Sequence, residues 1–421
     1  MTEDLTQGVP MAVSTDVDLD RLGDDLDRQL ARADAALAQQ FPGDRPGRQP
    51  VHTVYVPADR YRRTVCRDWG DAALAALDEH RSMFAALMDE QGADAVDLEA
   101  RVRSKLANEP IEDLRVDFED GYGARSDEVE DGHASSAARE LATSIHEGTA
   151  APFFGIRMKC LEAPTRRRGL RTLVIVVRGL VVAQAPLHGL VTTLPKATSV
   201  DQVAAMVHVC EQLEQAFTLD VGTLRFEIQV ETPQAILGPD GTALVARMVQ
   251  AADGRCTALH YGTYDYSAFC GIAAEYQSMA HPVADHAKLV MQAAAAGTGV
   301  RLSDGSTNIL PVGDVEAVRD AWRLHLGLVR RSLERGYYQG WDMHPAQLPT
   351  RYAATFGFYR DGLPRTAGRL RNYLEQTGSG VLDEPATARA LADYLLRAAN
   401  CGAANATELQ ELTGLSIEAI S

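Results

Sequence analysis

Three short acidic segments each follow an apolar run that is typical of a buried strand. They are Asp117-Phe118-Glu119-Asp120, Gln229-Val230-Glu231-Thr232 and Tyr264-Asp265-Tyr266. A carboxylate at the end of an apolar strand is poorly solvated unless it binds a cation or a proton. The ends of several strands meet at one mouth in a parallel barrel or an open parallel sheet. The sequence therefore predicts a divalent-metal site at such a mouth.

The predicted metal ligands are Glu231 and Asp265, which follow two different apolar strands. Magnesium prefers oxygen ligands and typically takes one or two protein carboxylates together with water and substrate oxygens. Two carboxylates therefore suffice, and positions stay open for a chelating substrate. The alternative is that each carboxylate caps the helix that follows it, because Glu231-Thr232-Pro233 also has the pattern of a helix start. Asp117 and Glu119 are expected at the same mouth, and this third acidic segment favours a metal site over helix caps.

Asp117 and Glu119 are expected to face the same side of their strand, and Asp120 the other side, because alternate residues of a strand share a face. Two carboxylates that point into one mouth repel each other without a cation. Asp117 and Glu119 could therefore hold metal-bound water. The alternative is a buried ion pair with Arg115 or Arg157.

Two basic residues belong to the same predicted mouth. Arg157 lies in an apolar strand, where a guanidinium suits a planar carboxylate or a developing enolate oxygen. Its alternative role is that of structural partner to Asp117 or Glu119. Lys196 ends the fourth predicted strand, where a lysine could form a Schiff base. The acid-rich mouth favours instead a protonated ammonium in an ion pair.

Short apolar strands alternate with longer helical segments from residue 51 onward. The expected strands are Thr53–Val56, Leu114–Phe118, Phe154–Met158, Leu190–Pro195, Phe226–Val230, Thr257–Tyr261, Gly299–Leu302 and Tyr337–Met343. This alternation predicts an α/β fold, a (β/α)8 TIM barrel with its active site on the loops after the strands. A doubly wound sheet is the alternative, but no GxGxxG motif follows the first strand. Thr298–Asn308 is rich in Gly and Ser, so a loop is the alternative for the seventh strand.

Two helical segments flank the predicted barrel, which we place at residues 51–365. Residues 1–50 are expected to form an extension and a linker. Leucines recur there at helical spacing from Leu19 to Leu37, which predicts an amphipathic helix packed on the outside of the main domain. Partner binding is the alternative role of this helix. Residues 366–421 are expected to form a C-terminal helical tail.

The composition is that of a globular protein: 421 residues, of which 46% are hydrophobic and 24% are charged. The formal net charge of −17 argues against nucleic acid and anionic membrane as partners. The six cysteines lack CxxC or Cys/His spacing, which favours reduced thiols over a zinc or disulfide framework. We find no secretory signal and no apolar run long enough to cross a bilayer, so the expected location is the cytoplasm.

Eight short segments between residues 51 and 390 resemble the sequence motifs of one protein family and occur in the same order. They are His52–Pro57, Asp117–Asp120, Gly155–Met158, Leu194–Ala197, Gln229–Thr232, Tyr261–Tyr266, Met343–Gln347 and Gly380–Pro385. In this order they resemble the motifs RSxLFxP, DLED, VRIN, PKVES, IET, FGxxDY, IHPxQ and GxMIDxP. These motifs belong to the HpcH/HpaI aldolase and citrate lyase β-subunit family. That family includes malyl-CoA lyases and is related to malate synthases.

The resemblance implies a TIM barrel that binds Mg²⁺, or Mn²⁺, through Glu231 and Asp265. It implies that Arg157 contacts a 2-oxo acid or its enolate, with Lys196 beside it at the substrate. It also implies that Asp383 is the general base, which a neighbouring subunit often delivers in this family. Glu384 is the rival base by similarity to malate synthases. A homo-oligomer, a trimer or a hexamer, is expected.

The reaction implied by the resemblance is a Mg²⁺-dependent carbon–carbon lyase reaction of the aldol or Claisen type. Its substrates would be a 2-oxo acid such as glyoxylate or pyruvate and an acyl partner, for which a coenzyme A thioester is one candidate. A condensing enzyme of the malate synthase type is one alternative, and an inactive barrel that binds a metabolite or scaffolds partners is another. Val51 stands where the family has an arginine, and Thr198 where it has a glutamate, so substrate recognition differs most.

Overall fold

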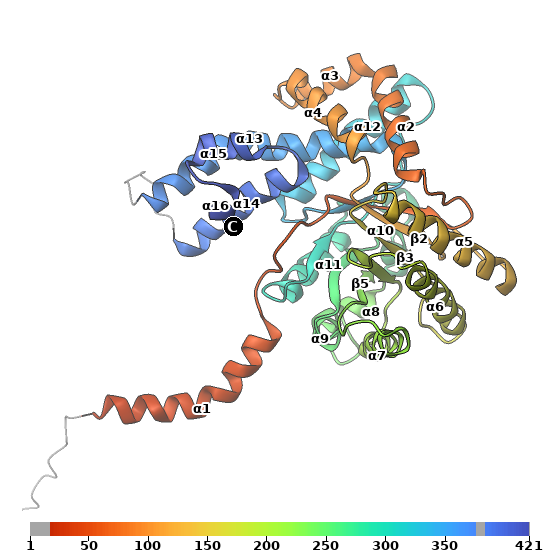
Figure 1. The fold of residues 1–421 in the computed structure, drawn as a ribbon. Coiled ribbons are helices and arrows are strands. Elements are labelled where there is room, and N and C mark those ends of the chain that lie inside the picture. The colour runs from red at the N-terminus through yellow and green to blue at the C-terminus, as the bar shows by residue number, and fades with distance from the viewer. Residues whose placement is uncertain (1–16, 376–383, 421) are drawn as a thin grey trace, which may run out of the picture.

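The computed structural model describes residues 17–375 and 384–420, and a barrel of parallel strands lies at its centre (Figure 1). The strands are β1 (His52–Pro57), β2 (Asp113–Asp117), β3 (Phe153–Arg157), β4 (Leu190–Leu194), β5 (Arg225–Val230), β6 (Cys256–Tyr261), β7 (Arg301–Ser303) and β8 (Gly340–Asp342). Their order in the sheet is β7-β6-β5-β4-β3-β2-β1-β8. A parallel bridge from Ser303 to Gln339 joins the two edges. The predicted (β/α)8 TIM barrel is therefore confirmed.

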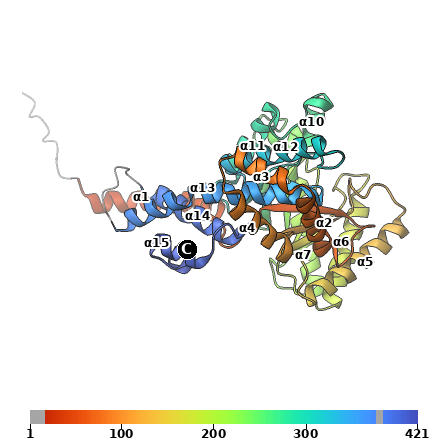
Figure 2. The same ribbon diagram turned by 90° about the horizontal axis from the view of Figure 1, so that it is seen from above.

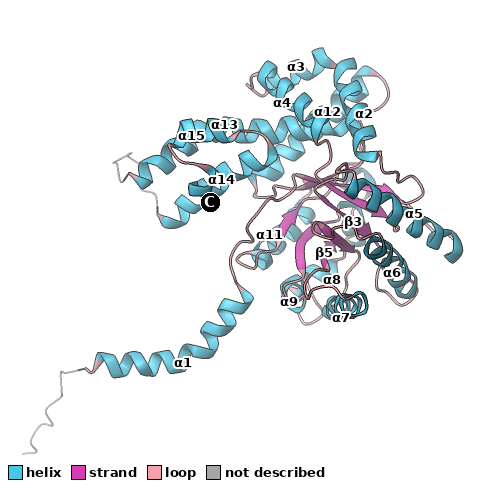
Figure 3. Ribbon diagram, in the orientation of Figure 1, coloured by secondary structure: helices cyan, strands magenta, loops and turns pink. Residues whose placement is uncertain are grey.

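Helices surround the barrel and follow nearly every strand (Figure 3). Those of the barrel region are α2 (Val65–Glu79), α3 (Arg81–Glu90), α4 (Ala95–Asn108), α5 (Asp127–His146), α6 (Arg166–Val182), α7 (Val200–Phe217), α8 (Pro233–Ile236), α9 (Leu244–Ala251), α10 (Thr263–Phe269), α11 (Pro282–Ala295) and α12 (Val315–Glu334). Two 3₁₀ turns, η1 (Ala274–Tyr276) and η2 (Pro345–Gln347), lie in the loops.

The two faces of the strands differ in polarity, and this difference fills the barrel with charged groups. On β5, Phe226, Ile228 and Val230 are fully buried in the apolar core that the helices complete. Glu227 alternates with them and points inward. Its Oε2 accepts a 2.7 Å hydrogen bond from Arg115 of β2, which is three strands away in the sheet. Such a contact is possible only across the barrel interior.

A second apolar core lies beside the barrel and joins it to the C-terminal helices. It is built by α2, α3, α4 and α12 with α13 (Leu348–Leu374), and Trp322 packs edge-on against Phe84 inside it. The helices α14 (Pro385–Cys401), α15 (Ala406–Thr413) and α16 (Ile417–Ile420) cover the far end of α13 (Figure 2). The predicted boundary at residue 365 falls inside α13, which continues through Pro364.

Helix α1 (Leu19–Gln40) forms where the leucine spacing predicts it, but it does not pack on the barrel. None of its residues is buried, and Figure 1 shows it extending away from the rest of the molecule. The prediction that it covers the main domain is therefore wrong. The following linker is tied to the barrel, since Gly43 N–H donates to Gly297 C=O and Arg301 donates to the carbonyls of Gly47 and Arg48. These bonds direct the helix outward.

Within residues 17–375 and 384–420, no helix combines the length and the apolar character that crossing a membrane requires.

Candidate active site at the carboxyl ends of the strands

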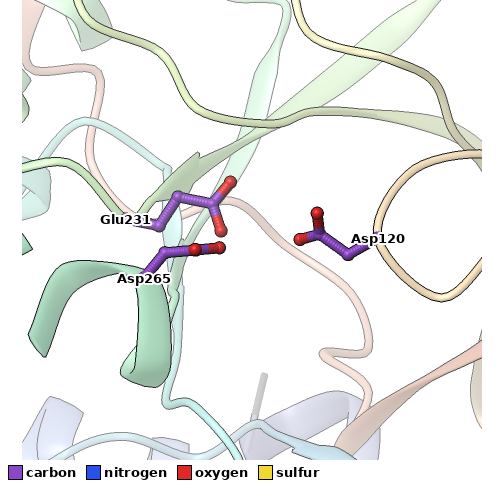
Figure 4. Close-up of side chains that lie close together, drawn as sticks. All are labelled: Asp120, Glu231 and Asp265. Atoms are coloured by element: carbon purple, nitrogen blue, oxygen red, sulfur yellow. The ribbon is translucent and has the colours of Figure 1, made fainter. Parts of the chain in front are cut away.

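Three carboxylates from different strand ends meet at one mouth of the barrel (Figure 4). Asp120 lies in the turn after β2, Glu231 directly follows β5, and Asp265 lies in the first turn of α10 after β6. One oxygen of each carboxylate lies within 4.8 Å of the others. The structure thus brings the predicted pair Glu231 and Asp265 together, although 34 positions separate them in the sequence.

Asp120 joins this cluster against the expectation from strand alternation. Side chains alternate between two faces only within a strand. The strand β2 ends at Asp117, so the rule does not apply to Asp120. A turn begins there, in which the N–H groups of Tyr122 and Gly123 donate to Glu119 C=O at 3.2 and 2.8 Å. The turn points Asp120 toward the mouth. The glycines at 121 and 123 were the sequence signal for this turn.

Glu231 is held in a buried position by its neighbours. Its Oε1 accepts a 2.8 Å hydrogen bond from the backbone N–H of Lys196, whose φ is +50°. On the other side lies Gly262, where a Cβ atom would come within 2.4 Å of the Glu231 Cβ. Burial, and then the nearby Glu119 and Asp265, raise the pKa of Glu231 to about 8 despite Lys196 and Arg157. A carboxylate in this state gains more from a divalent cation than an exposed one does.

The donor set fits a hard divalent cation. All three clustered groups offer carboxylate oxygens, the ligands that Mg²⁺ and Mn²⁺ prefer, and no sulfur or imidazole atom belongs to the cluster. Asp120 is exposed and Asp265 is half-buried, so one side of the cluster is open to solvent and to a substrate. Glu231, Asp265 and Asp120 are therefore the residues that could hold such an ion.

Asp117 is engaged by Arg157 and by the turn after β2. Arg157 Nε and Nη2 donate to the two Asp117 oxygens, both at 2.7 Å. The same oxygens accept from the N–H groups of Glu119 and Gly121 at 3.0 and 2.9 Å. This is the buried ion pair that the sequence left open as an alternative. The predicted contact of Asp117 and Glu119 with metal-bound water stays a prediction.

Arg157 presents its remaining edge to the mouth. Its Nη1 lies 3.5 Å from Gln229 Oε1 and 3.5 Å from Glu119 Oε2. Its guanidinium lies over the rings of Tyr55 and Trp341, 4.7 and 5.5 Å from their centroids. The Asp117 carboxylate raises the pKa of Arg157 against the effect of burial, so the side chain stays charged. The sequence did not single out Tyr55 and Trp341, and only the inward position of Tyr55 on its strand pointed to it.

Lys196 places its ammonium among the carboxylates. Its Nζ donates to Glu119 at 2.5 Å and to both Asp120 oxygens at 2.9 and 2.8 Å, and it lies 3.6 Å from Asp265 Oδ2. The pKa of Lys196 is raised, because the attraction of Glu231 and the other carboxylates outweighs burial. A protonated ammonium is no nucleophile, so this geometry favours the predicted ion pair over a Schiff base. Burial, and then the neighbouring Asp120, raise the pKa of Glu119 to about 7 despite Arg157 and Lys196.

A cavity of about 360 Å³ opens beside the carboxylate cluster. It is large enough for a small organic acid. Its wall is formed by Tyr55, Pro57, Arg60, Asp117, Asp120, Gly121, Arg157, Gln229, Glu231, Gly262, Thr263, Tyr264, Asp265, Trp341 and Met343. The predicted base Asp383 lies outside the described residues. The rival base Glu384 is exposed and directly precedes α14.

Comparison with protein families assigns the chain. A family model described as "Domain of unknown function (DUF6986)" matches residues 30–421. The chain belongs to this family. No curated protein matches it in sequence.

Solved structures similar to this DUF6986 chain carry the names that the sequence motifs indicate. The malate synthase of Haloferax volcanii in its lead(II) complex has a TM-score of 0.51 at 14% identity, covering 85% of this chain and 89% of that one. The citrate lyase β subunit of M. tuberculosis, with oxaloacetate and magnesium, has a TM-score of 0.41 at 18% identity, covering 72% and 96%. An HpcH/HpaI aldolase/citrate lyase family protein of Burkholderia cenocepacia J2315 has a TM-score of 0.39 at 15% identity, covering 74% and 93%. At these identities the likeness is one of fold.

Proposed function

We propose that this protein is a divalent-metal-dependent carbon–carbon lyase or condensing enzyme that acts on a small 2-oxo acid. The observation that carries the proposal is the cluster of Asp120, Glu231 and Asp265 beside the Nη1 group of Arg157, which takes no part in the bidentate pair with Asp117. A carboxylate cluster that holds a cation and a guanidinium that binds a carboxylate are the two groups that a 2-oxo acid needs. The order of the motifs, and the name of the Haloferax volcanii malate synthase with the same fold, support it.

Glu231, Asp265 and Asp120 would hold the metal, Mg²⁺ or Mn²⁺. When bound, it supplies Lewis-acid polarisation of the substrate carbonyl. Arg157 binds the carboxylate of glyoxylate or pyruvate, or the enolate oxygen of the partner, with the Nη1 edge that Asp117 leaves free. The rings of Tyr55 and Trp341 pack against its guanidinium. These contacts restrict the orientation of the guanidinium before substrate binds, so little conformational entropy is lost on binding. Lys196 keeps the excess negative charge of the mouth low and lies at the substrate.

Asp383 is the proposed general base, on the strength of the tail motif at residues 380–385. Its task is to remove the α-proton of the acyl partner in condensation, and to return it in cleavage. A coenzyme A thioester is one candidate for the acyl partner. Replacing Asp383 by Asn should abolish proton exchange from that α-carbon, followed by NMR in D₂O, whereas Glu384→Gln should leave it intact. Exchange that survives in Asp383→Asn removes this residue from the mechanism.

Chelation tests the proposed chemistry. Purified enzyme is incubated with malyl-CoA-like thioesters, and the release of glyoxylate or pyruvate is followed as the phenylhydrazone. We expect turnover to stop with EDTA and to return with excess Mg²⁺. Turnover that survives the chelator would refute the metal, and trapping of Lys196 by borohydride with pyruvate would establish a Schiff-base aldolase instead. Binding of a 2-oxo acid without turnover of any substrate would show an inactive barrel.

A further inference from the structure

A second cavity lies at the opposite mouth of the barrel, where the strands begin. Its volume is about 610 Å³, which falls in the range of small-molecule sites. The linker at residues 45–50 forms one wall. The first residues of the strands, among them Asp113, Leu190 and Arg225, form much of the rest. No residue of the proposed active site lines this cavity.

Three arginines of this cavity, Arg45, Arg225 and Arg301, lack a carboxylate partner among the described residues. Their hydrogen bonds go to backbone carbonyls instead. Arg45 Nη2 donates to Gly254 C=O at 3.2 Å, and Arg301 Nη2 donates to Gly47 C=O at 2.8 Å. Carbonyl groups fix the position of a guanidinium, but they do not neutralise its charge. The cavity therefore carries fixed positive charge.

This arrangement is costly in a chain with 58 acidic and 41 basic residues. Acidic partners are abundant, yet three like charges surround one cavity. Burial, with further repulsion from Arg397 and Arg45, lowers the pKa of Arg301 to about 10, and burial and Arg225 lower that of Arg45. A bound anion would remove this repulsion.

We infer that this cavity is a second ligand site, which binds a small organic polyanion through Arg45, Arg225 and Arg301. Guanidinium groups pair with phosphate and with carboxylate in the same bidentate manner, so phosphate esters and tricarboxylates share the required chemistry. Tyr55 and Glu227 lie between the two cavities, joined by a 3.4 Å hydrogen bond from Tyr55 to Glu227. This layer separates the anion from the metal-dependent mouth.

Calorimetric titration tests this site with inorganic pyrophosphate and with citrate as probes, at matched ionic strength. The measurement uses the full chain without added metal, because both probes chelate Mg²⁺. We expect saturable binding that weakens at least about tenfold in Arg301→Gln and in Arg45→Gln. The matched control is Arg247→Gln, an exposed arginine on α9 paired with Asp240, which removes the same charge elsewhere. Thermal melts establish that each variant is folded.

Pyrophosphate binding alone would identify a phosphate ester as the natural class, and citrate binding alone a tricarboxylate. Either result supports the site if only the cavity variants weaken it. The inference is overturned if neither probe binds, or if Arg247→Gln weakens binding as much as Arg301→Gln does. Should one cavity variant fail to fold, the other carries the test.

Discussion

The two mouths of one barrel carry opposite charge. Four carboxylates and two arginines line the cavity where the strands end, whereas five arginines and two carboxylates line the cavity where they begin. A layer that includes Tyr55, Arg115 and Glu227 separates the two inside the barrel. The same parallel architecture therefore carries the proposed cation site at one end and the proposed anion site at the other. The two cavities differ in charge as well as in size. Size alone does not locate the carboxylate cluster, because the larger of the two cavities lies at the other end of the barrel.

The largest effect is expected from substitutions at the acidic mouth, the end of the barrel where the strands end and the carboxylates cluster. Replacing Glu231 by Gln, or Asp265 by Asn, removes a carboxylate from the proposed metal site while preserving its size. We expect kcat/KM to fall by about 1,000-fold or more, because metal polarisation of a carbonyl is worth several kcal/mol. The measurement is the glyoxylate or pyruvate assay at saturating Mg²⁺.

The matched control is Glu316→Gln on the exposed first turn of α12. Its activity should equal that of the wild type. Full activity in Glu231→Gln would show that the reaction does not depend on this carboxylate cluster.

The second prediction compares the buried ion pairs of the two mouths. Arg157 pairs with Asp117 near one end, and Arg115 pairs with Glu227 near the other. Removing either arginine leaves a buried carboxylate without its partner, so Arg157→Gln and Arg115→Gln should each lower the free energy of unfolding by about 3 kcal/mol. Urea denaturation measures this loss.

The conservative lysine variants of the two arginines should differ in KM. Arg157→Lys keeps the charge but loses the bidentate geometry, and we expect KM for the 2-oxo acid to rise about tenfold. Arg115→Lys should leave KM unchanged, because this residue does not line the active-site cavity. Equal KM values for both would remove Arg157 from substrate binding.

The third prediction is the pH dependence of Mg²⁺ binding at the acidic mouth. The pKa of Glu231 is about 8 in the metal-free protein, and metal binding requires the ionised form. Mg²⁺ affinity should therefore rise about 25-fold between about pH 6.5 and about pH 8.5. Below pH 8 the folded protein holds this proton more tightly than the unfolded chain, so the contribution of Glu231 to metal-free stability is lost as pH rises toward 8.

Calorimetry across this pH range checks the slope. The guanidinium groups at the other mouth remain charged throughout this range. A Mg²⁺ affinity that is flat with pH, or that falls as pH rises, contradicts the assignment of Glu231 as a ligand.

The smallest effect is expected from a change in the packing around Glu231. In Gly262→Ala the new Cβ would lie 2.4 Å from the Glu231 Cβ, so one of the two residues must shift. We expect Mg²⁺ affinity to weaken about tenfold, as when other groups that orient a metal ligand are changed. Gly132→Ala, on α5, has nothing within 4 Å of the added Cβ and should leave the affinity unchanged. Equal affinities in the two variants would show that Glu231 tolerates displacement.

The acidic mouth was predictable from sequence where strand periodicity holds. Glu231 and Asp265 both follow apolar strands, and parallel strands bring such ends together, so their proximity was foreseen. Asp120 was assigned to the wrong side, because β2 ends at Asp117 and the alternation rule fails in the turn after it. That the pair with Asp117 uses Nε and Nη2 of Arg157 and leaves Nη1 toward the mouth depends on exact side-chain contacts, which no spacing encodes.

The basic mouth left no comparable sequence signal. Arg45 comes from an irregular linker, Arg225 from the first position of β5, and Arg301 from a short strand in a Gly- and Ser-rich segment. These positions share no period, and only the closed barrel brings them together. The leucine spacing of α1 predicted the helix, but whether it packs on its own chain depends on the path of the linker.

Magnesium titration of the metal-free protein by calorimetry at about pH 8 tests the central claim most directly, since most other expectations follow from a cation at the acidic mouth. We predict that the wild type binds one ion per chain, and that Glu231→Gln and Asp265→Asn each abolish this binding while Glu316→Gln preserves it. Absence of binding to the wild type, or equal binding by all four proteins, would contradict the account.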